Sequence, residues 1–384
     1  MPPSSGISRV WLNTIAAMVC LVSVFVPWAM SANARSSDFV SHYAAGEMLR
    51  EDRGQLYSLS AQRTYQAAQG TRKFLPWVHP AVEAAVFAPL TLMPIGMAFR
   101  VWQALNVAAL CWMAFALRRY LGEMSGAQMG AVFATGIPVG AGLWAGQDHI
   151  LCLVLYTAAF LLMEDGRDVA GGCVLGLTFV RFQLAFPVLV FFVAIRRWRV
   201  VEGAAATVLA MVAGSFALVG RGLVPSYRAA LTYLAMAHDM SSATRMPSVR
   251  GLVAFVVHDP HELAVVTAVV SVVVIGVAAV EWARADERRF DLLFASALLI
   301  GLAVDYHAFL YELSEVMLAG VLVVRRCPGF AVWLWAMGLA EVAVMPLEGS
   351  FSLLTPMLVG AGWWVARKAQ GREVRGWNAE SPGR

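Results

Sequence analysis

Residues 168–199 read DVAGGCVLGLTFVRFQLAFPVLVFFVAIRRWR, and this stretch decides the class of fold. Two apolar runs, 168–181 and 184–196, are separated by a polar turn at Arg181 and followed by a basic cluster at 196–199. The stretch predicts two helices joined by a tight turn. Positively charged loops normally stay on the cytoplasmic side of a membrane, so the basic cluster is predicted inside and the turn outside.

The composition around this stretch is that of an integral membrane protein. The 384 residues are 59% hydrophobic and 14% charged, with a mean hydropathy of +0.66, whereas soluble domains carry about a quarter charged residues. Apolar runs of about 20 residues recur from Val10 to Val365, the length that a helix needs to cross ~30 Å of hydrocarbon. These runs are too long for barrel strands. The sequence therefore predicts an all-α integral membrane protein.

Charge and cysteine content exclude other classes. The formal net charge of +4 comes from short basic turns, which are typical of topology signals rather than of a nucleic-acid surface. The five cysteines lie in or beside apolar runs without a CxxC pair. The sequence therefore predicts no nucleic-acid partner, no disulfide framework and no thiolate metal site.

The basic clusters set the predicted topology of about 12 transmembrane helices, with the N-terminus inside. The predicted helices are 9–30, 95–117, 126–144, 149–163, 168–181, 184–196, 200–219 and 262–282, then two that end at Asp305 and Arg325, and two more before the basic tail. The first outer loop, 31–94, includes a proline-bounded segment, 79–93, at the outer surface, and 220–260 is the second outer loop. Residues 1–368 are predicted to form one polytopic domain, and 369–384 a disordered tail.

Asp38 follows the first predicted helix on the outer side. Phe39, Val40 and Tyr43 come after it at helical spacing, which predicts a short amphipathic helix lying on the bilayer with a carboxylate at its start. The alternative is that Asp38 is simply an N-cap. Both interpretations stay open at this point.

Other polar residues mark helix ends on the same outer face. They are Gln147, Asp148, Arg181, Gln183, Arg245, Arg250, Asp305, Tyr306 and His307, with Trp77 and His79 in the first loop. Charged residues at helix ends are often interfacial anchors. Arg181 is harder to dismiss, because it lies at the tip of a tight turn on the face that positive charge avoids.

A carboxylate, several cations and aromatic rings at a membrane surface suit the transfer of a sugar from a lipid phosphate. The carboxylate would deprotonate an acceptor hydroxyl, and Arg and His would hold the phosphate that leaves as an anion. Tyr and Trp would stack on the sugar and the isoprenoid. The alternative is a secondary transporter or lipid flippase, although paired inverted halves are not evident.

The order of several motifs resembles glycosyltransferase family 87, a family of C-type glycosyltransferases. The motifs are Asp38, Tyr43, Gly46, Gly54 and Tyr57, then Pro80, Pro89, Pro94, Trp102 and Asn106, then Gly146-Gln147, Gly171-Gly172, Arg181, Met246-Pro247, Arg250-Gly251 and Tyr306-His307. The resemblance implies a C-type glycosyltransferase fold in a bacterial inner membrane, with the active site on the extracytoplasmic face. It implies an inverting transfer of mannose or a related sugar from a polyprenyl-phosphate donor to a glycolipid or glycan acceptor. Neither a metal nor another cofactor is implied, and a monomer is the default.

The resemblance also suggests roles for residues. Asp38 maps onto the catalytic base, with Asp148 as a second candidate. Predicted donor-phosphate contacts are Arg181, His307, Arg250 and Arg245, and predicted substrate contacts are Tyr43, Trp77, His79, Gln147, Asp148, Gln183 and Tyr306. Two departures stand out: Arg181 replaces a lysine, and Tyr311-Glu312 replaces a His-Asp pair.

Overall fold

The computed structural model describes residues 34–71, 74–122, 137–237, 243–334 and 354–371. The described residues form α-helices and short 3-10 helices, without strands. The predicted helix 9–30, the first part of 126–144, most of the helix predicted after Arg325 and most of the predicted tail fall outside these ranges.

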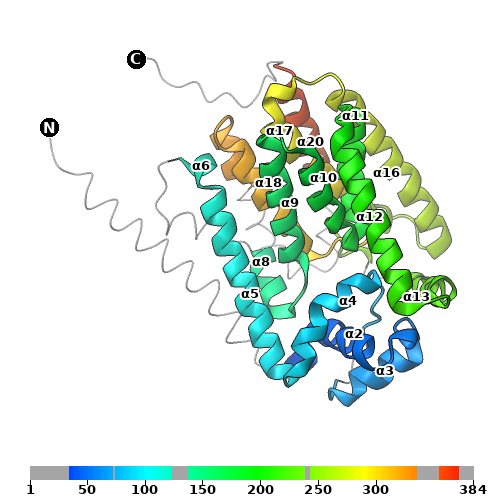
Figure 1. Ribbon diagram of the computed structural model, residues 1–384. Helices are drawn as coiled ribbons and strands as arrows, with labels where there is room; N and C mark the ends of the chain where they lie inside the picture. Colours follow the sequence, from blue (N-terminus) through cyan, green and yellow to red (C-terminus); the bar gives the residue numbers. More distant parts are fainter. Residues whose placement is uncertain (1–33, 72–73, 123–136, 238–242, 335–353, 372–384) are drawn as a thin grey trace, which may run out of the picture.

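Three short helices and their connections form a cap at one end of the molecule (Figure 1). The cap, residues 34–92, contains α2 (Phe39–Glu51), α3 (Leu59–Ala68), α4 (Ala81–Phe87) and the 3-10 helices η1 (Ala34–Ser36), η2 (Arg53–Gln55) and η3 (Ala88–Leu92). Nine α2 residues are buried, and α2 packs against α3, α4 and η3. The predicted helix after Asp38 is therefore present, but the expectation that it lies amphipathically on a bilayer surface is wrong, because other cap elements cover it.

The longer helices form a bundle on one side of the cap (Figure 1). They are α5 (Ile95–Ala116), α8 (Ile137–Ala145), α9 (His149–Glu164), α10 (Asp168–Leu177), α11 (Phe182–Ala194), α12 (Trp198–Val219), α13 (Leu223–Ala237), α16 (Pro260–Trp282), α17 (Phe290–Val304), α18 (Ser314–Val323) and α20 (Leu354–Ala369). Shorter elements are α6 (Arg118–Leu121), η4 (Thr178–Arg181), α15 (Val249–Val253), η5 (Glu287–Arg289) and η6 (Leu310–Leu313). Helix α17 is buried from Leu292 to Val304 and packs closely on α20.

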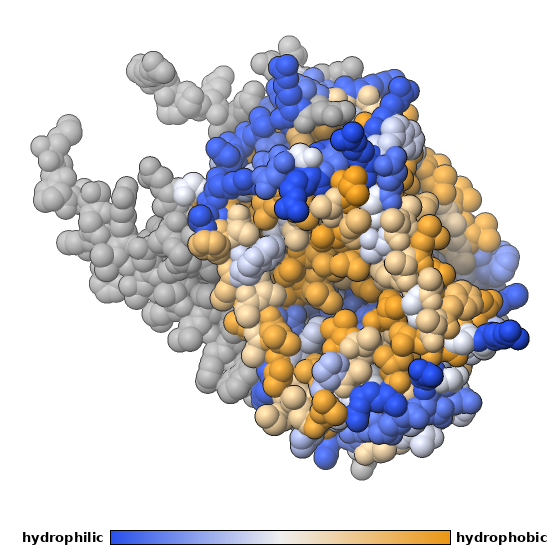
Figure 2. Space-filling view, in the orientation of Figure 1, coloured by the Kyte–Doolittle hydropathy of each residue, from blue (hydrophilic) through white to orange (hydrophobic). Residues whose placement is uncertain are grey.

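Four described segments are long and apolar enough to cross a membrane: Ile95–Ala116, Asp168–Ala194, Trp198–Val219 and Pro260–Trp282. Three shorter apolar helices accompany them: Ala81–Leu92, His149–Glu164 and Phe290–Val304. Figure 2 shows hydrophobic side chains between two hydrophilic ends of the visible face. These features indicate a membrane protein, and the total of twelve spans stays a prediction.

The segment Asp168–Ala194 reverses direction rather than running straight. A straight helix of its 27 residues would be about 40 Å long. Yet Nη2 of Arg197, just beyond it, lies 2.6 Å from Oδ1 of Asp168 at its start. The chain therefore turns back at η4, as the position of Arg181 predicts.

Basic residues from separate turns meet at the other end of this hairpin, here called the basic end. The guanidinium of Arg197 lies 4.4 Å from the centroid of the Phe290 ring, and Arg289 donates to the carbonyl oxygen of Lys368 at 2.6 Å. Arg326 donates to Asp291 at 2.6 Å, and Arg325 lies 6.0 Å from the Tyr120 ring centroid. Turns far apart in sequence thus share one end of the bundle, and the predicted order of reversals stays a prediction.

Candidate functional site

Asp38 lies at the N-cap position of α2, but its carboxylate does not cap the helix. Its Oδ2 accepts a hydrogen bond of 2.7 Å from Nε2 of Gln147, on the turn between α8 and α9. The side chain is half-buried. Asp38 therefore lies at the N-cap position, but its carboxylate is hydrogen-bonded to Gln147 instead of to the helix.

The turn that carries Gln147 and Asp148 depends on Gly146. This glycine has φ +71°, and a Cβ there would lie 2.7 Å from Cβ of Phe39. The indole N–H of Trp102 donates to the carbonyl oxygens of Gly146 and Gln147, at 3.1 and 3.3 Å. A left-handed residue without a side chain thus lets the turn lie against the start of α2.

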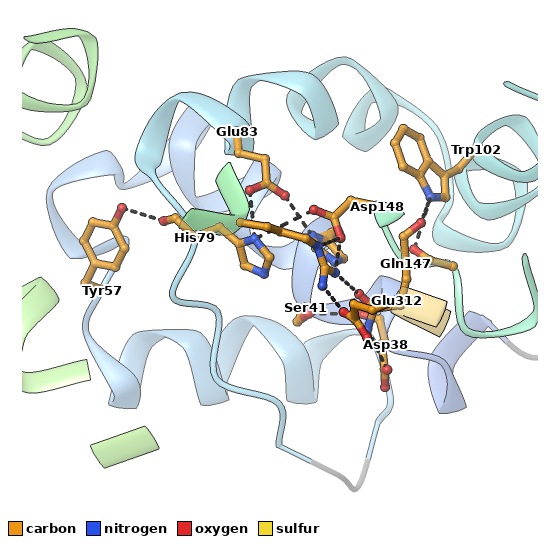
Figure 3. Close-up of polar contacts among 12 residues, drawn as sticks. Asp38, Ser41, Tyr57, His79, Glu83, Trp102, Gln147, Asp148 and Glu312 are labelled. Carbon is orange, nitrogen blue, oxygen red and sulfur yellow. Dashed lines mark hydrogen bonds and ion pairs between the residues drawn. The ribbon is translucent and has the colours of Figure 1, made fainter. Parts of the chain in front are cut away.

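Arg181 joins three elements at the centre of the site. Its Nε donates to Oδ1 of Asp148 at 2.9 Å, and Nη2 donates to Oε1 of Gln147 at 2.9 Å and also contacts Asp148. Its Nη1 donates to Oε1 of Glu312 in η6. Four of the five guanidinium N–H groups are therefore engaged by the protein. Figure 3 shows Gln147 and Asp148 between Glu83 on one side and Asp38 and Glu312 on the other.

Two buried carboxylates compete for the one guanidinium. Burial by itself disfavours the charged form of Asp148, but the adjacent charge of Arg181 outweighs it and holds the pKa of Asp148 well below its usual range. Burial raises the pKa of Glu312 to about 8, and the attraction of Arg181 only partly opposes this. At neutral pH, Asp148 is thus the firmly ionised partner, and Glu312 is much closer to its protonation midpoint.

A second group, here called the His-Glu cluster, consists of His42 in α2, His79 before α4, and Glu83 in α4. Nδ1 of His79 lies 2.8 Å from Oε2 of Glu83, and Nδ1 of His42 lies 3.7 Å from Oε1. Nδ1 of His79 also lies 3.9 Å from Oδ2 of Asp148, so the cluster adjoins the Arg181 network. Burial lowers the pKa of both histidines, that of His79 to about 4, so both rings are neutral at pH 7.

The cap holds His79 in place through its backbone and its ring. Tyr57 donates its hydroxyl proton to the carbonyl oxygen of His79 at 2.8 Å. Gln62 in α3 bonds both the N–H and the carbonyl of Trp77, at 2.9 Å each, and the Trp77 ring stacks on the His79 ring with centroids 5.8 Å apart. Polar contacts across the cap therefore position the segment that leads to α4.

Arg250, Tyr306 and His307 lie together on α15 and the loop after α17. Arg250 is buried, donates to the carbonyl oxygen of Tyr306 at 3.2 Å and lies 4.2 Å from the centroid of its ring. The backbone N–H of His307 donates to Oδ1 of Asp305 at 2.8 Å. Arg245 is exposed nearby in sequence.

Three predicted substrate residues, Tyr43, Trp77 and Gln183, have described contacts or positions outside the Arg181 network. Tyr43 is buried and donates to the carbonyl oxygen of Met93 at 2.9 Å, and Trp77 is 1% exposed. Gln183 is half-buried at the first turn of α11. The structure brings Asp38, Gln147, Asp148, Arg181 and His79 together, and it places Tyr43 and Trp77 in the packing of the cap. Their contact with substrate stays a prediction.

Sequence reasoning assigned no role in the site to four residues that the structure adds. They are Glu312, His42, Glu83 and His149; the ring of His149 is 5.8 Å from that of Tyr311. Glu312 belongs to the pair noted as a departure from the family, which was a usable signal. His42 and Glu83 carried none, because only the crossing of α2 and α4 brings them together.

Comparison with known proteins gives two matches. The family model described as Glycosyltransferase family 87 matches residues 77–311, more than half of the chain. Arg181, Arg250 and His307 lie within the matched region, while Asp38 precedes it and Glu312 follows it.

A curated protein from Mycolicibacterium smegmatis is 28% identical over an alignment of 218 residues that covers 54% of this chain. It is named polyprenol-phosphate-mannose-dependent alpha-(1-2)-phosphatidylinositol pentamannoside mannosyltransferase. The match spans 51% of that relative's length, about half. No solved structure matches the chain.

Proposed function

Because the chain belongs to glycosyltransferase family 87, we propose that it is an inverting, polyprenyl-phosphate-dependent sugar transferase. The sugar is mannose or a related hexose, as the name of the mycobacterial relative suggests, and the acceptor is an extracytoplasmic glycolipid or glycan. The observation that carries the proposal is the chain of contacts from the Asp38 carboxylate through Gln147 to the Arg181 guanidinium. These contacts bring a carboxylate and a guanidinium together, which supports the proposed roles of base and anion-binding cation.

In the proposed reaction, Asp38 takes the proton of an acceptor hydroxyl as its oxygen attacks the anomeric carbon of the donor. A new glycosidic C–O bond forms while the C–O bond to phosphate breaks, and polyprenyl phosphate leaves with the electron pair. A single displacement inverts the anomeric centre. The leaving phosphate needs charge stabilisation, which a guanidinium supplies.

Burial and electrostatics favour Asp38 over Asp148 as the base. Asp38 is half-buried, and the described hydrogen bond engages its Oδ2. Asp148 is 0% exposed, and Arg181 holds its pKa well below the usual range. A carboxylate with so low a pKa is a weak proton acceptor, so Asp148 is proposed to fix Arg181 rather than to move the proton.

Arg181 can offer more than one N–H group to a donor phosphate by exchanging partners. Four of its N–H groups are engaged, and Glu312 is the partner whose burial raises its pKa to about 8. Protonated Glu312 would release Nη1 to a phosphate oxygen. Arg250, Arg245 and His307 are proposed as further phosphate contacts, and Tyr306, Gln183 and His79 as substrate contacts.

The predicted location follows from the two ends of the bundle. The basic end would face the cytoplasm under the positive-inside rule, which puts the cap and the Arg181 network at the extracytoplasmic face. We propose a multi-pass protein of the bacterial inner membrane, one polytopic domain over 1–368, acting as a monomer.

The test uses purified wild type and Asp38→Asn, Asp148→Asn and Asp165→Asn variants with radiolabelled polyprenyl-phosphomannose and a lipid extract of the native host. Asp165 is the matched control, since it lies at the basic end and its side chain is 61% exposed. We expect Asp38→Asn to lower turnover by on the order of 10²–10⁴-fold, the usual contribution of a general base, and Asp165→Asn to match wild type. A folded Asp38→Asn protein with full turnover would exclude this mechanism.

A further inference from the structure

The His-Glu cluster brings together nitrogen and oxygen atoms that could bind a metal ion and that form no hydrogen bonds with one another. Nδ1 of His42, Nδ1 of His79 and both carboxylate oxygens of Glu83 are buried polar atoms that lack a hydrogen-bond partner among the described residues. The 2.8 Å between His79 and Glu83 is a close approach without hydrogen-bond geometry. Buried polar atoms are nearly always satisfied, so this concentration in one place needs an explanation.

The spacing of these donors fits a single metal ion. One donor atom from each of the three residues can be chosen so that all lie within 4.8 Å of one another. A tetrahedral site with metal–ligand bonds of about 2.0–2.1 Å separates its donors by roughly 3.3–3.4 Å. His79 Nδ1 lies 2.8 Å from Oε2 of Glu83 and His42 Nδ1 lies 3.7 Å from Oε1, so each imidazole approaches its own carboxylate oxygen at a distance near that value.

Two of the three ligands lie on helices that pack against each other, His42 on α2 and Glu83 on α4, and His79 lies just before α4. Gly46, one turn after His42 on α2, would place a Cβ 2.8 Å from the backbone nitrogen of Ala88 and 2.8 Å from the carbonyl carbon of Phe87. Phe87 is one turn after Glu83 on α4, so this close approach sets the separation of His42 from Glu83. The His42 ring also stacks on Phe87, with centroids 4.6 Å apart.

The local charge also calls for a cation. Described contacts link the carboxylates of Asp38, Glu83, Asp148 and Glu312 to the single guanidinium of Arg181, directly or through Gln147 and His79. Glu83 and Asp148 are both buried, and their carboxylates are close enough to repel each other when both are charged or to share a hydrogen bond when one is protonated. Uncompensated buried charge is costly, so a proton or a metal ion must lie among them.

We propose that His42, His79 and Glu83 bind a divalent transition metal of the zinc class. Two imidazoles and one carboxylate suit zinc-like ions, whereas magnesium and calcium prefer oxygen donors. Three protein ligands leave a coordination position open for water or a substrate oxygen. The His79 side chain is 21% exposed although its Nδ1 is buried, and Asp148 lies just beyond the three ligands.

This inference goes beyond the transferase reaction, and the resemblance to the family does not imply it. Its test needs neither donor nor acceptor, so failure of the metal site and failure of the transferase proposal are distinguishable. The full chain is purified without a polyhistidine tag, loaded with zinc, dialysed, and analysed for metal by mass spectrometry. A parallel sample is loaded with cobalt, whose visible absorption reports its coordination.

Wild type is expected to retain zinc at one ion per chain and to give a cobalt spectrum of a nitrogen- and oxygen-ligated site. Glu83→Gln, which keeps the shape of the side chain, should lose both signals. Its zinc affinity should fall by more than the roughly 10–100-fold that loss of an outer-shell partner costs. His79→Asn should behave in the same way.

His261→Asn is the matched control, because His261 is exposed at the first turn of α16. It should bind zinc like wild type. Equal zinc retention by wild type and a folded Glu83→Gln protein would overturn the proposal. Failure of wild type to retain zinc would overturn it as well, and would assign a proton to Glu83 instead.

Discussion

Arginine–carboxylate pairs occur at both ends of this molecule, in opposite surroundings. At the basic end, Arg326 is 43% exposed and pairs with Asp291, and Arg119 is 47% exposed beside Glu164. At the site, Arg181 is 11% exposed, and its partners Asp148 and Glu312 are 0% and 1% exposed. Exposed pairs contribute little to stability, whereas a buried pair is costly to form and costlier to break. The same pairing chemistry therefore forms exposed surface contacts at one end and a buried network at the other.

Removal of the buried cation tests this difference most strongly. Arg181→Ala leaves Asp148 and Glu312 buried without their partner, and breaking such a pair costs about 3–5 kcal/mol. We expect a large drop in thermal stability in detergent, together with loss of sugar transfer. Arg181→Lys should recover part of the stability, because it restores the charge but not the forked geometry. A stability loss no larger than that of Arg326→Ala would contradict the contrast between the two ends.

Asp305, a buried carboxylate near the site, should make the stability of the protein depend on pH. Burial raises the pKa of Asp305 to about 6 from 3.8. A raised carboxyl pKa favours the folded state below the unfolded pKa, and this contribution is lost as pH rises through about 6. Asp305→Asn removes the charge, so its stability relative to wild type should be unchanged at pH 4. At pH 7.5 the free energy of unfolding of Asp305→Asn should exceed that of wild type by up to about 3 kcal/mol.

Thermal unfolding of both proteins from pH 4 to 8 checks this prediction. Asp165→Asn, at an exposed position of the basic end, should show no such trend. A constant difference between Asp305→Asn and wild type across the pH range would show that burial does not perturb Asp305.

Packing density should differ between the ends as well. A Cβ at Gly46 would meet the backbone of the α4–η3 junction at 2.8 Å, whereas one at Gly329, near the basic end, would meet nothing within 4 Å. Gly46→Ala should cost about 1–3 kcal/mol, as overpacking does. It should also weaken metal retention, because it moves His42 away from Glu83. Gly329→Ala should keep wild-type stability and zinc content, and equal behaviour of the two variants would refute the role of the Gly46 contact.

The smallest effect is expected from the exposed pairs themselves. Arg326→Ala should change the free energy of unfolding by about 0–1 kcal/mol, and high salt should reduce even that difference, because screening weakens exposed charges. Unfolding at low and high ionic strength measures it. A salt-independent loss of several kcal/mol would mean that the basic end is more than a set of exposed surface contacts.

Much of the bundle could be predicted, because long apolar runs and basic turns are local signals. The predicted helices 149–163, 200–219 and 262–282 correspond to α9, α12 and α16 within two residues at each end. The turn at Arg181 was also predicted, and the family resemblance is confirmed by the match over 77–311.

The site was less predictable, because its contacts span long sequence separations. Arg181 and Glu312 are 131 residues apart, and Asp38 and Gln147 are 109 apart. The burial of α2 was missed for the same reason, since its covering elements lie later in the chain. Asp38, Arg181 and the Gln147 turn were nevertheless selected, because charged residues at helix ends of one face are unusual enough to notice.

The side-chain amide of Gln147 fixes the direction of the hydrogen bonds that run from Arg181 to Asp38. Its oxygen accepts from Arg181, which can only donate, and its nitrogen donates to the Asp38 carboxylate, which can only accept. The amide therefore has one satisfied orientation and cannot flip without losing both bonds. A glutamate of the same size would place a second hydrogen-bond acceptor opposite the Asp38 carboxylate. Gln147→Glu should therefore disturb the site strongly, although it hardly changes the size of the side chain.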